Sequence, residues 1–294
     1  MNNFVKRTLS GAVFVAVTVG AILGGGYFSI PLFLFFALGT LWEFYRLIWK
    51  PEQRPNDLIS IGIMAGVLFY LGCVFDAALE KLQLNCFWDT EINYLLSRTC
   101  FLLAIVFLFL VGGLLVVKSK RENPFADWGK TVLGIFYIIL PFSLVPRLAL
   151  MSSKIPSMWL LLLPLLFTWV NDTGAYCVGS LLGKHKLIPS VSPGKSVEGF
   201  IGGLFFCMLL GGFFFMSTTN EAEHKEMVAI SGGICGILVA LAAVLGDLVE
   251  SRLKRSLGVK DSGVFLPGHG GFLDRFDSLL FTLPMMWNIF SIIN

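Results

Sequence analysis

Long apolar stretches separated by short polar segments run along almost the whole chain. A helix needs about 20 mostly apolar residues to cross the hydrocarbon layer of a bilayer, so each stretch predicts a membrane-spanning helix. We therefore expect an all-α polytopic membrane protein with about nine spans. They are expected at residues 8–24, 27–47, 58–75, 99–117, 131–151, 157–180, 198–217, 227–250 and 278–293.

The first apolar stretch follows Lys6 and Arg7 and could also be read as a signal peptide. A clear cleavage site is missing, and a second stretch begins directly after the glycines at 24–26. We expect a retained first helix. The glycines predict either a tight hairpin or a first helix that does not fully cross the membrane.

Basic residues are distributed unevenly among the expected loops. With the amino terminus inside, the inner loops hold 16 Lys and Arg residues and the outer loops hold 4. Cytoplasmic loops of membrane proteins are enriched in these residues. The amino terminus and the polar loops 181–197 and 251–277 are therefore expected in the cytoplasm.

Composition agrees with the membrane class and excludes several others. Hydrophobic residues make up 56% of the 294-residue chain and charged residues 14%, whereas soluble domains carry about 25% charged residues. A net charge of +3 gives no indication of a nucleic-acid partner. The six cysteines form no C-x-x-C pair, so neither a disulfide framework nor a zinc site is expected.

The segment from Ser251 to Asp277, S-R-L-K-R-S-L-G-V-K-D-S-G-V-F-L-P-G-H-G-G-F-L-D-R-F-D, departs most from the apolar background. Ionisable residues beside lipid are costly and mark functional sites. Just before and within this segment, four polar residues share one helix face at i, i+3, i+4 and i+7: Asp247, Glu250, Ser251 and Lys254. Such a face suits a bound cation with a phosphate above it. The alternative is a helix end contacting lipid head groups, which does not account for Asp247.

The second part of this segment combines glycines with two aspartates. Residues 266–271, L-P-G-H-G-G, cannot form regular helix, and glycines let a ligand approach the backbone. Asp274 and Asp277 follow one turn apart at the start of the last span. Both could cap that helix. We expect Asp274 to bind a hard cation such as Mg²⁺ instead.

Further polar residues lie near the inner ends of other spans. Residues 194–196, Gly-Lys-Ser, look like a P-loop, but Pro189 stands where its first glycine is required. We expect this lysine- and hydroxyl-rich loop to hold nucleotide phosphates, with contact to anionic lipid as the alternative. Asp172 is a further candidate. Glu43 and Arg46, three residues apart, are expected to neutralise each other.

The chain resembles the phosphatidate cytidylyltransferases, integral membrane enzymes that make CDP-diacylglycerol. Their signature runs S-x-x-K-R, K-D, P-x-H-G-G and D-R-x-D, and residues 251–277 match it without departure. N-D-T-G-A-Y, S-P-G-K-S-V-E-G and G-D-L-V-E-S upstream are also similar to the family. Residues 1–130, about four spans, match mainly in hydropathy, so the resemblance predicts that residues 131–294 form the catalytic region.

The resemblance implies transfer of CMP from CTP to phosphatidate by a magnesium-dependent, dimeric enzyme. Since no large cytosolic extension is seen in the sequence, we expect an enzyme of the bacterial inner membrane. By motif position, Asp247 and Asp274 would bind the metal, with Asp277 and Asp172 next, through a second cation or by supporting the ligands. The implied phosphate-binding residues are Lys254, Arg255, Lys260 and Arg275, and the implied contacts to nucleotide or lipid are Ser192, Lys195, Ser196, Ser251, Gly270 and Gly271. His269 would either donate to a phosphate or shape the loop.

Two other functions remain open from the sequence. A CTP-using lipid kinase would phosphorylate a lipid alcohol, not activate a lipid phosphate. A transporter of anionic lipids or nucleotides would place charges near the bilayer midplane and show repeat symmetry.

Overall fold

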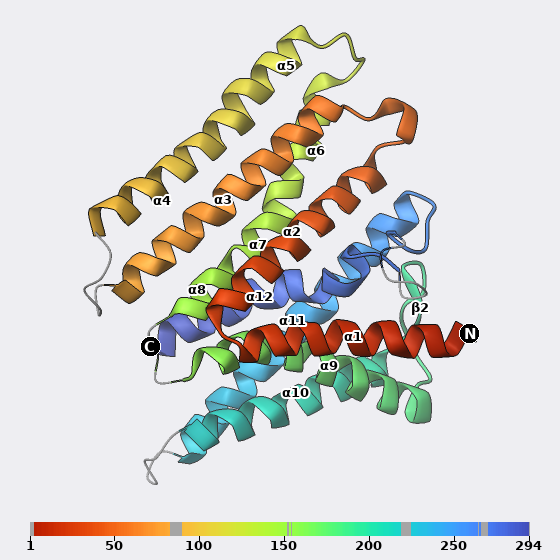
Figure 1. The fold of residues 1–294 in the computed structure, drawn as a ribbon. Helices are drawn as coiled ribbons and strands as arrows, with labels where there is room; N and C mark the ends of the chain where they lie inside the picture. Colours follow the sequence, from red (N-terminus) through yellow and green to blue (C-terminus); the bar gives the residue numbers. More distant parts are fainter. Residues whose placement is uncertain are drawn as a thin grey trace. The chain divides into compact units, whose positions relative to one another are not determined.

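The computed structural model describes residues 3–82, 90–151, 153, 155–218, 225–263, 265 and 270–293. Within these residues, eight helices are long and apolar enough to cross a membrane. A further apolar helix, α1 (Asn3–Leu23), precedes them. The prediction of an all-α polytopic membrane protein with about nine spans is therefore confirmed (Figure 1).

The chain divides into two compact units. Unit 1 holds residues 1–158 and 261–275, and unit 2 holds residues 159–260 and 276–294. The end of the motif segment thus packs with the amino-terminal helices. This division concerns packing only, and residues 131–294 as the catalytic region stay a prediction.

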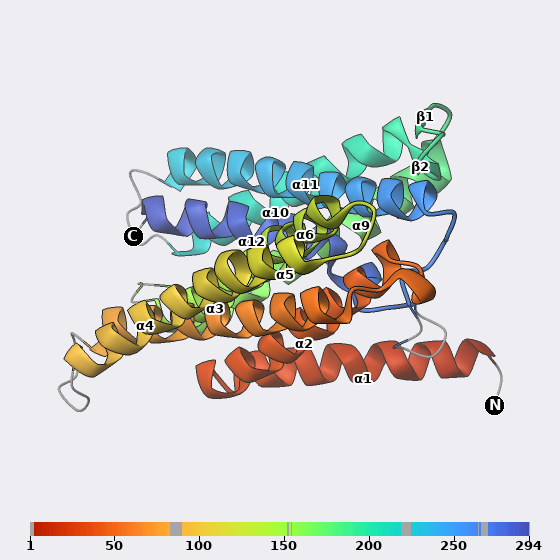
Figure 2. The same ribbon diagram turned by 90° about the horizontal axis from the view of Figure 1, so that it is seen from above.

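Unit 1 is built from four helical spans preceded by α1. Two are single helices, α2 (Gly26–Ile48) and α3 (Asn56–Leu82), joined by the short 3₁₀ helix η1 (Pro51–Gln53). Two are composite and contain π-helical turns: α4 (Thr90–Ile105), η2 (Val106–Val111) and α5 (Gly112–Lys118), then α6 (Pro124–Gly134), η3 (Ile135–Ile139), α7 (Leu140–Phe142) and α8 (Leu144–Leu150). Figure 2 shows α4 and α5 continuing in one direction beside α3.

Buried polar groups fix the packing of unit 1. Gly25, with φ of +87°, makes the turn between α1 and α2, as a hairpin requires. The Tyr45 hydroxyl donates to the Thr131 carbonyl at 2.7 Å. The Trp128 indole N–H, from α6, donates at 2.8 Å to the carbonyl of Leu108, which lies in the π-helical turn η2. A buried N–H or O–H must find an acceptor, so these bonds set how the helices lie against one another.

Unit 2 contains α9 (Ser157–Leu182) from Trp159 onward, α10 (Val197–Thr218), α11 (Lys225–Ser256) and most of α12 (Leu273–Ile293). Glycines let α10 and α11 touch along their backbones. A Cβ on Gly236 would collide with the Cys207 carbonyl, and one on Gly232 with that of Gly211. The four-residue spacing of Gly232 and Gly236 is typical of helices that pack closely, and here the contact lies within the chain.

Both polar loops contain regular structure. Within residues 181–197, β1 (Lys186–Ile188) and β2 (Ser192–Ser196) pair as an antiparallel hairpin. Part of the segment 251–277 is helical. Helix α11 continues to Ser256 because its polar residues pair along one face of the helix.

Candidate active site

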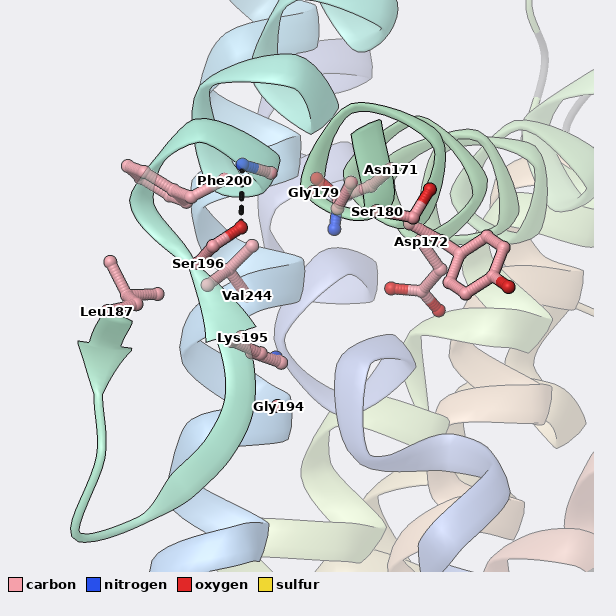
Figure 3. Close-up of a pocket in the computed structure, with 13 residues that line it drawn as sticks. Asn171, Asp172, Gly179, Ser180, Leu187, Gly194, Lys195, Ser196, Phe200 and Val244 are labelled. Atoms are coloured by element: carbon pink, nitrogen blue, oxygen red, sulfur yellow. Dashed lines mark hydrogen bonds between the residues drawn. The ribbon is translucent and has the colours of Figure 1, made fainter. Parts of the chain in front are cut away.

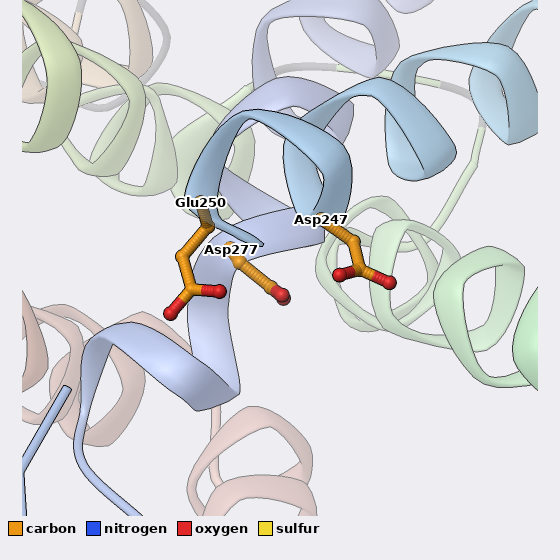
Figure 4. A group of neighbouring side chains, drawn as sticks. All are labelled: Asp247, Glu250 and Asp277. Carbon is orange, nitrogen blue, oxygen red and sulfur yellow. The ribbon is translucent and has the colours of Figure 1, made fainter. Parts of the chain in front are cut away.

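Three carboxylates from two helices of unit 2 converge. Asp247 and Glu250 lie one turn apart on α11, and Asp277 lies on α12. One oxygen of each lies within 4.8 Å of the others, and Figure 4 shows the carboxylate of Asp277 between those of Asp247 and Glu250. Gly246 makes this possible, because a Cβ there would meet the backbone carbonyl of Asp277. The close crossing of α11 and α12 therefore builds the cluster.

Two lysines and one hydroxyl contact this carboxylate cluster. Lys254 Nζ lies 2.6 Å from Glu250 Oε2, and the Ser251 hydroxyl donates to Asp247 at 3.2 Å. Lys195, from strand β2, forms an ion pair with Asp247. The helical face predicted from the spacing of these residues is confirmed. The basic partner of Asp247 is therefore Lys195, from another element. The sequence shows no basic residue one helical turn before Asp247.

The cluster holds more carboxylate than ammonium groups. Two lysines contact these three carboxylates, and Glu250 is fully buried. Carboxylates this close repel one another when ionised, and a bound cation would relieve that repulsion. The donor atoms are all carboxylate oxygens, the ligands that hard cations such as Mg²⁺ prefer. The residues therefore fit a divalent cation.

A cavity of about 330 Å³ opens in unit 2 between α9, the hairpin and the start of α10. Its wall combines polar and apolar groups, and Figure 3 shows Asp172, Lys195 and Ser196 around it. The described residues that line it are Asn171, Asp172, Ala175, Tyr176, Gly179, Ser180, Leu187, Gly194, Lys195, Ser196, Gly199, Phe200 and Val244. Lys195 belongs to this wall and pairs with Asp247, so the cavity adjoins the carboxylate cluster.

The hairpin beside the cavity is anchored at both ends. The carboxylate of Glu198, in the first turn of α10, accepts from the backbone N–H of Lys184 at 3.1 Å. Its Oε1 lies 2.6 Å from His185 Nδ1. At the turn, Arg255 Nε donates to the Val191 carbonyl at 3.5 Å. These contacts hold Lys195 and Ser196 against the cavity.

The predicted metal ligand Asp274 makes contacts of a different kind, within unit 1. Its Oδ2 accepts from the backbone N–H groups of Gly271 at 2.8 Å and Ser262 at 3.0 Å. It also accepts from the Ser262 hydroxyl at 2.9 Å. Asp274 therefore ties the glycine segment to the start of α12. Its role as a metal ligand stays a prediction.

One residue pair was assigned wrongly from the sequence. Glu43 accepts hydrogen bonds from the backbone N–H groups of Phe272 and Leu273, at 3.0 Å each. The Arg46 guanidinium lies over the Trp42 ring instead, 4.3 Å from its centroid. Spacing on one helix could not reveal a partner more than 200 residues away.

The structure thus brings only some of the predicted residues together. Unit 2 holds a connected group of Asp172, Lys195, Ser196, Asp247, Ser251, Lys254 and Asp277. Ser192 and Arg255 belong to its hairpin contacts. Gly270, Gly271, Asp274 and the exposed Arg275 lie in unit 1, while Lys260 is exposed at the end of a unit 2 segment. His269 lies outside the described residues.

Sequence reasoning missed two contributors in unit 2. Glu250 was placed on the right helix face, yet it was not assigned to the metal group. Its carboxylate lies with those of Asp247 and Asp277 in the group that could hold a cation. Asn171 lines the cavity next to Asp172 and is 3% exposed. Its only signal in the sequence is a polar residue inside an apolar span.

A family profile and several known proteins match this chain. The profile of the cytidylyltransferase family matches residues 5–293. A protein of Staphylococcus saprophyticus named phosphatidate cytidylyltransferase is 33% identical over 280 residues, which cover 95% of this chain and 96% of that protein. A protein of the same name from Staphylococcus aureus strain COL is 39% identical over 170 residues, or 58% of this chain and 62% of its own length.

Proposed function

This chain belongs to the cytidylyltransferase family, and from that premise we propose that it transfers CMP from CTP to phosphatidate. The products are CDP-diacylglycerol and pyrophosphate. The observation that carries the proposal is Lys195, which lines the polar cavity and pairs with Asp247 of the carboxylate cluster. A nucleotide in that cavity would have its phosphates beside the metal-binding carboxylates.

The reaction joins two polyanions, so its main difficulty is repulsion. An oxygen of the phosphatidate phosphate attacks the α-phosphorus of CTP. A new P–O bond forms as the bond to the bridging oxygen breaks, and pyrophosphate leaves with that electron pair. The nucleophile is already an anion near neutral pH, so no strong base is needed. The protein's task is to neutralise charge and orient both groups in line.

We assign roles to this chain's residues on that basis. Asp247, Glu250 and Asp277 would hold Mg²⁺, which neutralises phosphate charge and orients the phosphates when bound. Lys195 and Ser196 would hold the CTP phosphates, and Lys254 the phosphate nearest Glu250. Asp172 would serve a second cation or orient a ligand. Asp274, Arg255, Lys260, Arg275, Ser192, Ser251, Gly270, Gly271 and His269 keep the roles implied by the motif.

The membrane setting follows from the same proposal. The protein would lie in the plasma membrane of a bacterium, with its amino terminus and polar loops in the cytoplasm, where CTP is available. Phosphatidate would reach the site sideways from the inner leaflet, its acyl chains along the helices. We propose that the enzyme is a homodimer, as the family resemblance implies.

The test uses purified protein, Mg²⁺, phosphatidate and CTP labelled at either the α- or the γ-phosphate. We expect label in the lipid product from α-labelled CTP and none from γ-labelled CTP, together with release of pyrophosphate. Lipid labelled only from γ-labelled CTP, with diacylglycerol or a polyprenol as acceptor, would instead establish a kinase. No labelled lipid from folded protein with either nucleotide would overturn the proposal.

A further inference from the structure

The carboxylate of Glu43, near the inner end of α2, is directed at the start of α12. Glu43 is 6% exposed. Its two oxygens accept separately: Oε2 from the Phe272 N–H and Oε1 from the Leu273 N–H. Phe272 directly precedes α12 and Leu273 is its first residue, so both N–H groups lie where a helix offers no backbone acceptor. Glu43 therefore supplies from a distant helix what a capping residue normally supplies locally.

Ser262 extends this contact to a second carboxylate. Its hydroxyl lies within hydrogen-bonding distance of Glu43 Oε1 and lies 2.9 Å from Asp274 Oδ2. A hydroxyl has one hydrogen, so it donates to one of the two at a time. Ser262 Oγ also accepts from the Asp274 N–H at 3.3 Å. Glu43, Ser262 and Asp274 thus form one network around the start of the helix.

The glycines beside this network are required by it. A Cβ on Gly271 would collide with Glu43 Oε1, and one on Gly263 with Glu43 Oε2. Gly270 has φ of +83°, which side chains disfavour, and the space where its Cβ would lie is filled by Asp274. In the structure, Gly263, Gly270 and Gly271 make room for the protein's own carboxylates. The expected approach of a ligand to Gly270 and Gly271 stays a prediction.

We propose that Glu43 is a positioning residue for the cytidylyl transfer, fixing the start of α12 and so the direction of Asp277. This inference rests on the proposed function. Asp277 lies four residues after Leu273 on the same helix, and the start of a helix sets where its next turn presents its side chains. Glu43 acts from outside the group of metal-binding carboxylates. Residues that orient metal ligands in this way typically change metal affinity or activity about 10- to 100-fold when replaced.

The test compares wild-type enzyme with E43Q, which keeps the size of the side chain but not its charge or its second acceptor oxygen. We expect kcat to fall about 10- to 100-fold and the half-saturating Mg²⁺ concentration to rise several-fold, with KM for CTP within about twofold. E43D, which keeps the charge, should recover part of the loss. Glu52→Gln is the matched control, because Glu52 is exposed on η1, and it should behave as wild type.

Amide hydrogen exchange provides a readout that does not need activity. Peptides covering residues 270–277 should exchange roughly 10-fold faster or more in E43Q, because one of the two hydrogen bonds is lost and the other is no longer charge-assisted. If the wild type makes no product, the proposed function fails, while the exchange result still tests whether Glu43 fixes the start of α12. Wild-type exchange in E43Q would overturn the inference. Wild-type kcat and Mg²⁺ dependence would do so as well.

Ser262→Ala keeps the inference testable if E43Q does not fold. It removes one hydroxyl and leaves both backbone hydrogen bonds to Glu43. We expect a change in the same direction in kcat and Mg²⁺ dependence, smaller than for E43Q. Ser262→Ala with faster amide exchange at residues 270–277 but wild-type kcat and Mg²⁺ dependence would contradict the proposal.

Discussion

At the scale of single residues, Lys195 connects the cavity with the carboxylate cluster. Its ammonium group pairs with Asp247 while its side chain forms part of the cavity wall. It is 28% exposed, so it can meet both a ligand and its carboxylate partner. A lysine in this position partly neutralises the cluster before a nucleotide arrives, and would turn toward phosphate once a cation takes over that task.

Lys195→Met should therefore affect both substrate binding and turnover. A hydrogen bond between charged groups contributes about 1.5–3 kcal/mol, so we expect kcat/KM for CTP to fall about 10- to 100-fold. Steady-state kinetics at saturating phosphatidate measures this. Lys186→Met is the control, because Lys186 lies on the same hairpin with an exposed side chain. Equal effects of the two changes would mean that bulk charge on the loop matters, and not Lys195 itself.

The sequence could predict which polar residues share one face of a helix. It could not predict their partners on other helices. The i, i+3, i+4 and i+7 spacing placed Asp247, Ser251 and Lys254 on one face, and the structure confirms it. The same kind of argument failed for Glu43, because its partners are backbone N–H groups 229 and 230 residues away. Backbone donors leave no mark in the sequence.

At the scale of elements, the contact between α10 and α11 depends on the absence of side chains. Gly211, Gly232 and Gly236 leave the two backbones in direct contact. In a membrane, such packing replaces the hydrophobic effect as the source of association between helices. The two helices therefore form a close pair beside the cavity and the carboxylate cluster.

Gly236→Ala should separate this pair. Its Cβ would meet the Cys207 backbone carbonyl, which cannot move as a flexible side chain could. Overpacking of this kind costs about 1–3 kcal/mol, so we expect a lower thermal unfolding midpoint in detergent. Gly129→Ala in α6 is the control, because nothing lies within 4 Å of its added Cβ. It should be neutral or stabilising. A Gly236→Ala protein as stable as wild type would show that the helices can move apart without cost.

Element boundaries were predictable where hydropathy defined them. The strands β1 and β2 were not, because three- and five-residue strands in a polar loop have no apolar alternation to reveal them. The π-helical turns η2 and η3 also lie inside uniformly apolar runs. A change from α to π pairing alters the hydrogen bonds but not the composition.

At the scale of the whole molecule, the two units do not follow the order of the chain. Unit 1 takes in residues 261–275, and unit 2 closes with residues 276–294. Residues 261–275 of the family-specific segment thus pack with the amino-terminal helices, while residues 251–260 belong to unit 2. Hydropathy could predict the number of spans, but not that this segment would return to the amino-terminal helices.

The predicted orientation can be tested with two single-cysteine variants in a cysteine-free background. Lys184→Cys lies on an exposed segment after α9, and Arg98→Cys is exposed on α4. With the amino terminus inside, a membrane-impermeant maleimide should label Lys184→Cys only in inside-out vesicles. It should label Arg98→Cys only in right-side-out vesicles. The reverse pattern would invert the topology and move the cavity to the outer face.

The long separation between Glu43 and its donors has a consequence for biosynthesis. Ser262 follows Glu43 by 219 residues, so α2 is inserted into the membrane long before its carboxylate can meet this hydroxyl. During translation, the charge at Glu43 must be met by water or by the insertion machinery. Unit 1 is finished only after the helices α9 to α11 have been made. A ribosome that stalls before residue 273 would therefore leave a nascent chain with an unfilled acceptor in its first half, a defect that membrane quality control could recognise.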